Sequence, residues 1–469
     1  MKYKITVTLC FLAMIFSIGC QSYEPAPLQM DLYQSNLENR IVDIEPVQVF
    51  AERLALQNGV PNAFDMQDGI SAEEGEVIAL FYNPSLRIAR LEAGVALANF
   101  ETAGLWEDPV FGFQGADISS PSAPFQFGMM MNFTIPISGR LAVEKERADS
   151  AYSTNLRKVA NLEWNTRSLV QSQWSHWTAA TMQVELLQEV AEQLERINAI
   201  ADLLEASDEM NRVERRLLKV DLVSYQVQIT KAELDVLQAE LALVETLGLP
   251  PTSAEYFIPI FPALMTVLVE DETSRIINAN TELAVSMAQY QTAEDSLRLE
   301  IKKQFPDIVL GSGYGSEFND HRVLIGVSIP LSIWNRNQAG IAHARTKREV
   351  ARAKSETTFA RIYRELALAN TTLSLTKKQR SYFDEMIIPL LKEQSKDIEN
   401  IMNLGEVDMF MLLETVTRHH EAKKNLVTLQ VTQLDAKITR NNILGPAYTI
   451  DTVKNDSDSA TENTLGGVQ

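Results

Sequence analysis

The sequence predicts a mainly α-helical fold with a small β-sheet part, and it predicts that this fold is built twice along the chain. In the first copy a helix begins at Asn83, a pair of short strands follows Pro109, and a long helical hairpin comes next. The same order recurs after Asn280 and Pro306, with the same spacing from asparagine to proline. A repeat of this kind favours one elongated body made of two related halves over two or three separate domains.

The helices are predicted from their start signals and their apolar periodicity. Asparagine caps a helix well and proline fits its first turn, so Asn83-Pro84 marks a start. From Leu141 to about Leu204 the chain has no proline, and apolar residues step by threes and fours. The return segment keeps a heptad seam: Val220, Val223, Val227, Thr230, Leu234, Leu237, Leu241 and Val244.

The helix lengths predict how each half is arranged. The outgoing helix would extend roughly 100 Å and the return helix only about 60 Å. The helix expected at Pro84–Trp106 matches the difference, so we expect it to stack end to end on the return helix. The second half repeats this arrangement. We expect its outgoing helix at Asn337–Leu404, its return helix at Val407–Ile443, and a short helix at Thr281–Gln304 that makes up the difference in length.

Four stretches of alternating apolar and polar residues predict strands, at about 109–118, 125–136, 306–316 and 322–333. Each is about ten residues long, which is the length of a tilted strand that crosses a bilayer. Alternation alone also fits a half-buried strand of a soluble sheet. The long flanking helices and the N-terminal signal described next favour the membrane interpretation.

The N-terminus predicts secretion. Lys2 and Lys4 precede an apolar run, Ile5–Ile18, and small residues follow, which is typical of a bacterial signal peptide. The ending resembles a lipobox, in which Cys20 becomes the lipidated N-terminus, although Ser17 stands where leucine is usual. Ordinary cleavage nearby is the alternative. No later segment offers the ~20 apolar residues of a membrane helix.

Composition excludes some partners. The chain has 42 basic and 62 acidic residues and a net charge of −20, which argues against a nucleic-acid surface. We expect a signal peptide (1–19), a lipidated tether (20–70), a first repeat (71–250), a second repeat (251–446) and a disordered polar tail (447–469).

Four strands cannot close a membrane sheet. Lipid leaves no partner for open backbone edges, and the smallest membrane barrels have about eight strands. Several chains must therefore share one barrel, and three copies would give about twelve strands. Their helical hairpins would form a hollow cylinder with the seam residues packed between hairpins.

From about Ser71 to Tyr448 the chain resembles the TolC family of outer-membrane efflux channels. The resemblance depends on Asn83-Pro84-Ser85-Leu86, on Pro109 and Pro306, and on the duplicated hairpin. The segment Ile329–Ala342 most resembles the CzcC-like branch, whose members serve heavy-metal efflux pumps of the RND type. The resemblance implies a homotrimer in the bacterial outer membrane, with a twelve-stranded β-barrel and a periplasmic α-barrel. It also implies docking to a periplasmic adaptor protein and an inner-membrane RND-type transporter.

The resemblance directs attention to the periplasmic hairpin tips. Asn403–Val407 resembles the family's turn, with Gly405 supplying the backbone geometry. Carboxylates just past this turn ring the closed aperture in the family, and Glu414 falls at one such position. We therefore expect Glu414 and Asp408 at a cation-selective gate, with Gly405 and Glu406 at an adaptor contact. A solvated acidic tip is the alternative.

The first tip, Ser207–Arg212, lacks the turn glycine and has a basic start. Asp208 and Arg212 are its candidate adaptor contacts, and the two tips need not be equivalent.

The sequence predicts no enzyme, no cofactor and no metal site, because it shows no catalytic constellation, phosphate loop or Cys/His metal spacing. His419 and His420 are adjacent and point about 100° apart on a helix, which favours two solvated residues. Met402, Met409 and Met411 could offer soft ligands to Cu(I), but adaptable packing is the commoner role of methionine on helices.

The leading hypothesis is a passive exit duct of a tripartite efflux system, for metal cations, driven by an RND-type pump through its adaptor. One alternative is a channel for drug or peptide export with a different pump. Another is a lipid-anchored periplasmic coiled-coil scaffold, which would have no need for the four strands.

Overall fold

The computed structural model describes residues 22–41, 44–58, 64–65, 68–116, 125–264, 269, 271–317, 320–331, 333–403 and 408–446. The chain divides into two compact units, Met1–Ile44 and Glu45–Gln469, and each is described by itself. The described part of the first unit contains helix α2 (Met30–Glu38) and the short 3₁₀ turn η1 (Asn39–Ile41).

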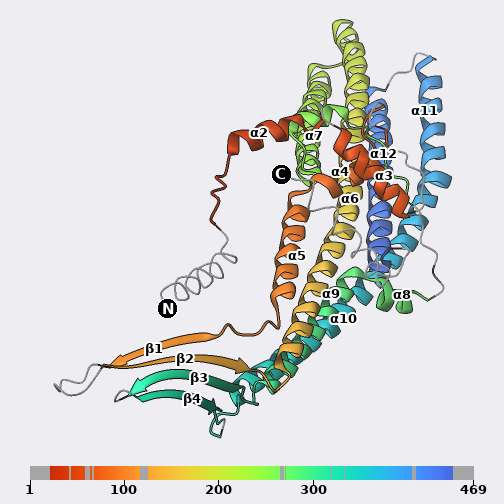
Figure 1. The fold of residues 1–469 in the computed structure, drawn as a ribbon. Helices are drawn as coiled ribbons and strands as arrows, with labels where there is room; N and C mark the ends of the chain where they lie inside the picture. Colours follow the sequence, from red (N-terminus) through yellow and green to blue (C-terminus); the bar gives the residue numbers. More distant parts are fainter. Residues whose placement is uncertain are drawn as a thin grey trace. The chain divides into compact units, whose positions relative to one another are not determined.

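The second unit consists of long helices that alternate with two pairs of strands (Figure 1). Its helices are α3 (Glu45–Asn58), α4 (Ala72–Tyr82), α5 (Pro84–Thr102), α6 (Arg140–Ala206), α7 (Arg212–Leu247), η2 (Pro251–Tyr256), α8 (Glu272–Ala279), α9 (Thr281–Lys302), α10 (Gln338–Tyr382), η3 (Phe383–Ile387), α11 (Ile388–Asn403) and α12 (Met409–Leu444). Its strands are β1 (Val110–Ala116), β2 (Gln126–Ile135), β3 (Ile308–Glu317) and β4 (Asp320–Ser328).

The long helices lie side by side in columns (Figure 1). α5 and α7 both pack on α6, α6 packs on α9 and α12, and both of these pack on α10. The column order is therefore α5 with α7, then α6, then α9 with α12, then α10 with α11. α5/α7 and α10/α11 are the outer columns.

The end-to-end stacking expected from the helix lengths is confirmed in both halves. Asn83 caps α5 by accepting from the Leu86 amide and donates to the Thr246 carbonyl near the end of α7, at 2.8 Å. Asn280 caps α9 in the same way and donates to the Ile443 carbonyl near the end of α12, at 2.8 Å. One asparagine thus joins the short helix to the return helix in each repeat.

A glycine allows this close stacking in each half. Gly248 has a φ of +70° and lies so close to the Tyr82 carbonyl that a Cβ atom would collide with it. Gly445, with a φ of +71°, meets the Ala279 carbonyl in the same way. Both glycines follow the return helix: Gly248 has the left-handed conformation that commonly ends a helix, and Gly445 has a positive φ with an extended ψ of 177°, which also favours glycine.

The strands form a four-stranded antiparallel sheet in the order β1-β2-β3-β4. Together with the dominance of helix, this confirms the expected fold class. The sheet order also matches the column order, because β1 follows α5, β2 precedes α6, β3 follows α9 and β4 precedes α10.

The helices pack through several local clusters rather than one central core. Trp174 is fully buried, stacks edge-on against Trp177 and donates to the Ile258 carbonyl at 3.0 Å. This contact holds the segment after η2 onto α6. Among the described helices, none is both long and apolar enough to cross a bilayer.

Two expected elements differ in detail. The outgoing helix of the second half is not continuous, because the π-helical turn η3 separates α10 from α11 just before Pro389. A proline inside a helix lacks an amide hydrogen and collides with the carbonyl four residues earlier, and a wider turn relieves both problems. β4 ends at Ser328, ahead of Pro330, which cannot donate to a sheet.

Candidate functional site

The register of the sheet gathers the large apolar side chains on one face. Phe111 lies opposite Met131, which lies opposite Ser312, and Ser312 lies opposite Ile325. Residues directly opposite share a face, and the next members of that face are two positions away. Most of its large apolar members are exposed: Phe111, Phe113, Met129, Met131, Phe133, Leu310, Tyr314, Val323, Ile325 and Val327. Phe127, Ile135 and Ile308 on the same face are half-buried.

The other face is mainly small and polar, with Gly112, Gln114, Gln126, Gly128, Asn132, Thr134, Gly311, Gly313, Gly315, Arg322, Gly326 and Ser328. The glycines let β3 approach β2 closely. A Cβ at Gly313 would lie 2.7 Å from the Met129 carbonyl oxygen, and one at Gly315 would lie 2.6 Å from that of Phe127. The sheet therefore has one apolar and one mainly polar surface, and on the polar surface Val110, Met130 and Leu324 are the exposed apolar exceptions among the described residues.

The sheet also has two open edges. β1 pairs only with β2 and β4 only with β3 among the described residues, and every residue of β4 is exposed. Unpaired strand edges of this kind attract another strand.

The helical columns are open on the same two sides. On α7 the predicted seam is exposed from Val220 to Leu241, with Val220 64% and Val227 65% accessible, and only its last member, Val244, is buried. On the opposite outer column Leu368, Leu375 and Tyr382 recur every seven residues and are also exposed. Residues on the other side of α7, such as Leu218, make the contact with α6.

The two outer columns differ in charge. α10 carries ten lysines and arginines against three glutamates, whereas α7 from Val220 to Leu247 carries one lysine against five carboxylates. The apolar stripes of the two edges are thus flanked by opposite charge. Complementary charge of this kind fixes the orientation and register of an interface.

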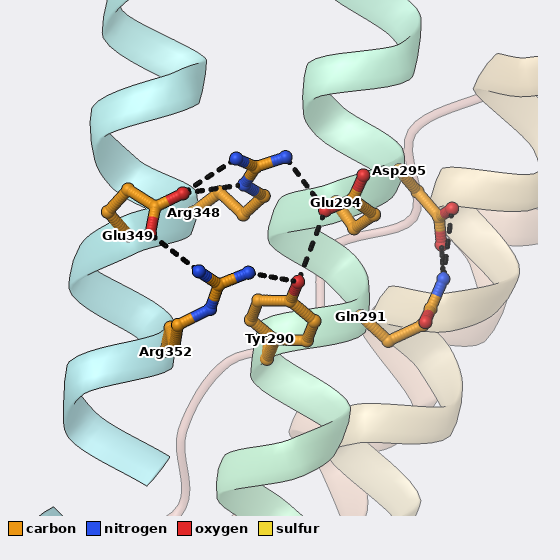
Figure 2. A network of polar contacts seen from close by, with 7 residues as sticks. All are labelled: Tyr290, Gln291, Glu294, Asp295, Arg348, Glu349 and Arg352. Carbon is orange, nitrogen blue, oxygen red and sulfur yellow. Dashed lines mark hydrogen bonds and ion pairs between the residues drawn. The ribbon is translucent and has the colours of Figure 1, made fainter. Parts of the chain in front are cut away.

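A polar network holds α10 in place on α9 (Figure 2). Arg348 contacts Glu294 at 3.4 Å and Arg352 donates to the Tyr290 hydroxyl at 3.4 Å. Both arginines also bind Glu349, at 2.6 and 3.2 Å, and the hydrogen bond from Arg348 lowers the pKa of Glu349 below its ordinary value. The network therefore joins α10 to α9 near the start of α10.

The first hairpin tip is well ordered by polar contacts. Asp208 takes the left-handed conformation, with φ at 58°, in the place where a turn glycine is missing. Asn211 and Glu214 form a capping box at the start of α7. Arg212 lies 3.6 Å from Glu205, so this candidate adaptor contact is partly engaged within its own tip.

The second tip is described from Asp408 onward, and Gly405 and Glu406 lie outside the described residues, as does Cys20. The Asp408 carboxylate caps α12 by accepting from the amides of Phe410 and Met411, at 3.0 and 3.1 Å. Glu414 is exposed and accepts from Arg418 at 2.6 Å. Both candidate gate residues, Asp408 and Glu414, therefore form hydrogen bonds with groups of α12 itself.

The two tips meet through an apolar cluster. Met409 at the start of α12 is 2% exposed and packs with Leu194 and Ile197 of α6 and Leu218 of α7. This methionine is a packing residue, while Met411 is exposed. The expectation of two solvated histidines is wrong for His420, which is 7% exposed and packs edge-on against Tyr225.

Sequence reasoning missed the contacts that join distant segments. Arg140, at the start of α6, donates to Asp307 at 2.9 Å and to Glu107 at 2.7 Å. His176 of α6 contacts Asp435 of α12 at 2.9 Å. No periodicity marks these residues. The described residues include no group of three His, Cys, Asp or Glu side chains placed to hold a metal ion.

Comparison with known proteins gives one curated relative and several solved structures, and no family model matches the chain. The cobalt-zinc-cadmium resistance protein CzcC of Cupriavidus metallidurans is 22% identical over 267 residues. The match covers 55% of this chain and 62% of CzcC, which is less than two thirds of the relative's length.

The solved structures share the fold. The Campylobacter jejuni outer-membrane channel CmeC superposes with a TM-score of 0.71 at 15% identity, over 83% of this chain and 89% of CmeC. A structure of CusC superposes with a TM-score of 0.67 at 17% identity, over 82% of this chain and 95% of that chain. The expected resemblance to TolC-family efflux channels and to their CzcC-like branch is confirmed.

Proposed function

We propose that this chain is the outer-membrane component of an efflux system and works as a passive exit duct made of several copies. One observation carries the proposal: the sheet and the helical layer both end in open edges, and these lie on the same two sides of the chain. A second copy can satisfy both at once, with β4 and α10/α11 of one protomer against β1 and α5/α7 of the next.

Such head-to-tail contacts form a ring when the rotation between copies closes. Three copies would bring about twelve strands into one wall, a number within the range of known membrane barrels. The exposed Phe, Met, Ile and Val side chains of the sheet would then face lipid, and the glycine-rich polar face would line the water-filled interior.

The substrate and the partners are inferred from the relatives. The name of CzcC connects that protein with resistance to cobalt, zinc and cadmium, and we infer metal cations as the cargo here. An RND-type pump would supply the energy through a periplasmic adaptor bound at the tips. We place Asp208, Arg212, Gly405 and Glu406 at that contact and propose that Cys20 carries the lipid anchor.

Assembly is tested with one seam variant and a matched control. Val227→Glu places a carboxylate in the exposed seam of α7, whereas Gln228→Glu places it on the neighbouring flank, which faces neither the seam nor α6. Burying an unpaired charge between helices costs several kcal/mol. We expect the wild type and Gln228→Glu to give detergent-stable trimers with discrete conductance in planar bilayers, and Val227→Glu to give monomers. A wild-type chain that is monomeric and needs no detergent would support the scaffold instead.

The gate is tested in the same bilayers. We place Glu414, together with Asp408, at the narrow end of the duct. Because Arg418 partly neutralises Glu414, Arg418→Gln should increase cation selectivity and block by divalent cations, and Glu414→Gln should decrease both. Unchanged conductance and block in both variants would remove Glu414 from the gate and leave it as a solvated tip residue.

A further inference from the structure

His420 is a buried histidine at a place where three helices meet. It lies on α12, is 7% exposed, and packs edge-on against Tyr225 of α7 with the ring centroids 6.0 Å apart. Its ring also forms a hydrogen bond with the backbone of Leu186 on α6. This side chain of the second hairpin therefore contacts both helices of the first hairpin.

His420 interrupts a contact that is apolar on either side of it. Toward the tip Met409 packs into the cluster of α6 and α7 residues, and in the other direction Val427 and Val431 pack with Ala179 of α6. Apolar packing does not change with pH, whereas histidine changes its charge between pH 5 and 8. Among the described residues of this contact, His420 is the buried group that titrates in that range.

The surroundings of His420 favour the neutral ring. Its Nδ1 atom is buried and has no hydrogen-bond partner among the described residues. Protonation would place a second N–H group there without an acceptor and would bury a positive charge. Burial accordingly lowers the pKa of His420 below its ordinary 6.5, and the charge of Lys424 lowers it further.

The carboxylates near His420 compensate that charge only in part. Glu189 of α6 and Glu421 of α12 favour the charged ring, but burial outweighs them. Glu189 is already engaged, because Lys423 donates to both of its carboxylate oxygens, at 2.9 and 2.8 Å. The other titratable groups of this region are Tyr225 and Asp221 of α7, Arg196 of α6, His419 and Lys424 of α12, and Lys392 of α11.

A cavity gives α12 room to move at this place. Its volume is about 590 Å³, it lies between α6, α11 and α12, and both His419 and His420 line it. Ser395 and Ile398 line it from α11. A polar cavity of this size admits water, so a small displacement of α12 can bring a protonated ring into contact with water.

We propose that His420 is a pH-sensitive switch, which keeps α12 on α6 and α7 while its ring is neutral and releases α12 when its ring is protonated. A group whose pKa is lowered in the packed state stabilises that state above its ordinary pKa and loses this contribution as pH falls through the lowered value. Release is therefore expected in mild acid. Because α12 also carries Glu414 and Asp408, mild acid would favour opening of the narrow end, and this consequence alone rests on the proposed function.

Two other groups of the same region could produce a response to acid. His419 is adjacent and half-buried, and partial burial also lowers its pKa. Protonation of Glu189 would break its ion pair with Lys423. The experiment separates the histidines by substitution, and it excludes the carboxylates by staying above about pH 5.5, where an ordinary glutamate remains charged.

Hydrogen exchange of the detergent-solubilised full chain, corrected for the intrinsic rate at each pH, measures the release. In the wild type the protection of α12 around His420 should fall up to about tenfold from pH 7.5 to pH 5.5, the factor by which a histidine of ordinary pKa gains protons in that range. His420→Gln keeps a donor for the Leu186 carbonyl but cannot titrate, so its protection should not change. His419→Gln is the matched control and should respond like the wild type.

A wild type without this response, or an equal response in His420→Gln, overturns the switch. If His420→Gln has already lost the protection of α12 at pH 7.5, the titration of His420 itself decides. Exchange of the carbon-bound imidazole hydrogen, followed by mass spectrometry in His419→Gln, reports the pKa of His420 alone. A value below 6.5 supports the switch, and a value at or above 6.5 overturns it.

The consequence for the duct is measured in planar bilayers at the same two pH values. The wild type and His419→Gln should conduct more at pH 5.5 than at pH 7.5, and His420→Gln should conduct equally at both. Discrete conductance without this difference overturns the connection between the switch and the narrow end, and it leaves the duct intact. Absence of discrete conductance at both pH values removes the proposed function, while hydrogen exchange still decides on the switch.

Discussion

The two outgoing helices of the repeat differ in continuity. α6 runs unbroken for 67 residues, whereas α10 ends after 45 residues in the π-helical turn η3, just before Pro389. α6 is packed on both sides by neighbouring columns, while α10 and α11 form an outer column. The same plan has therefore produced one continuous inner helix and one interrupted edge helix.

The two hairpins also differ in how closely their tips are packed. At the first tip Arg215 binds Asp202 at 2.6 Å, and Asn198 donates across the hairpin to the Leu218 carbonyl at 3.2 Å. Around the second hairpin a cavity of about 590 Å³ lies between α6, α11 and α12. Close packing rigidifies a helix pair and a cavity loosens it. The first tip is therefore closed by polar contacts within its own hairpin, whereas the second hairpin leaves a pocket against α6.

The largest effect is predicted for two variants, one that introduces a proline into α6 and one that removes Pro389 from α11. Glu192 is the exposed position of α6 that the Asn83-to-Asn280 repeat makes equivalent to Pro389. Glu192→Pro should destabilise the first hairpin by about 3 kcal/mol or more, because α6 has no wider turn to accommodate the ring. Pro389→Ala should stabilise the second by about 1 kcal/mol, the net value of one recovered hydrogen bond.

Hydrogen exchange of the detergent-solubilised protein measures both changes locally. Glu192→Ala is the control, and it should leave exchange in α6 near the wild-type rate. Faster exchange around residues 383–389 in Pro389→Ala would contradict the role given to the proline.

A smaller effect is expected at the two caps that begin the return helices. Asn211→Ala and Asp408→Ala should each cost about 1 kcal/mol, because each removes an acceptor for two helix amides. Thermal melting of the purified variants beside the wild type would show both losses.

Asp408→Asn distinguishes the capping role of Asp408 from its proposed role in the gate, since asparagine caps a helix as well as aspartate. It should melt like the wild type, and any change in its conductance then reports the lost charge. A loss of stability equal to that of Asp408→Ala would show that the charge, and not the cap, holds the end of α12.

Much of the fold could be predicted because it depends on local patterns. The Asn-Pro start, the helix lengths and the alternation in the strands each follow from a few neighbouring residues, and together they give the repeat and its stacking. The candidate site was harder to predict from the sequence. Pro389 is visible in the sequence, but whether a helix kinks, ends or widens there depends on its packing.

Contacts between distant segments could not be predicted. His419 and His420 look alike in the sequence, yet only the second lies under Tyr225 and is buried. Partial burial of His419 and fuller burial of His420 each lower the pKa of the histidine below its ordinary value. Which face of a helix meets a neighbour is set by the column order, and no single segment contains that information.

The smallest predicted effect concerns the contact that joins the two hairpins, His176 with Asp435. The hydrogen bond that His176 donates to the Asp435 carboxylate raises the pKa of His176 above its ordinary 6.5, although partial burial opposes the shift. Burial favours the neutral form of Asp435, but the hydrogen bonds from His176 and Ser172 outweigh it and lower its pKa. Between the two pKa values both partners are charged and attract each other.

The raised pKa of His176 decides how the stability of the protein changes with pH. A group whose pKa is raised on folding stabilises fully below its unfolded pKa and loses that contribution as pH rises through the folded value. The melting temperature of the wild type should therefore fall slightly more between pH 6 and pH 8 than that of His176→Gln, which keeps a donor to Asp435 but cannot titrate. Because His176 is 55% exposed, solvent screens the pair and keeps the difference small. Parallel curves for the two proteins would mean that His176 and Asp435 add no charge pair, and Lys423 with Glu189, at 2.8 Å, would then be the ion pair that joins α6 to α12 among the described residues.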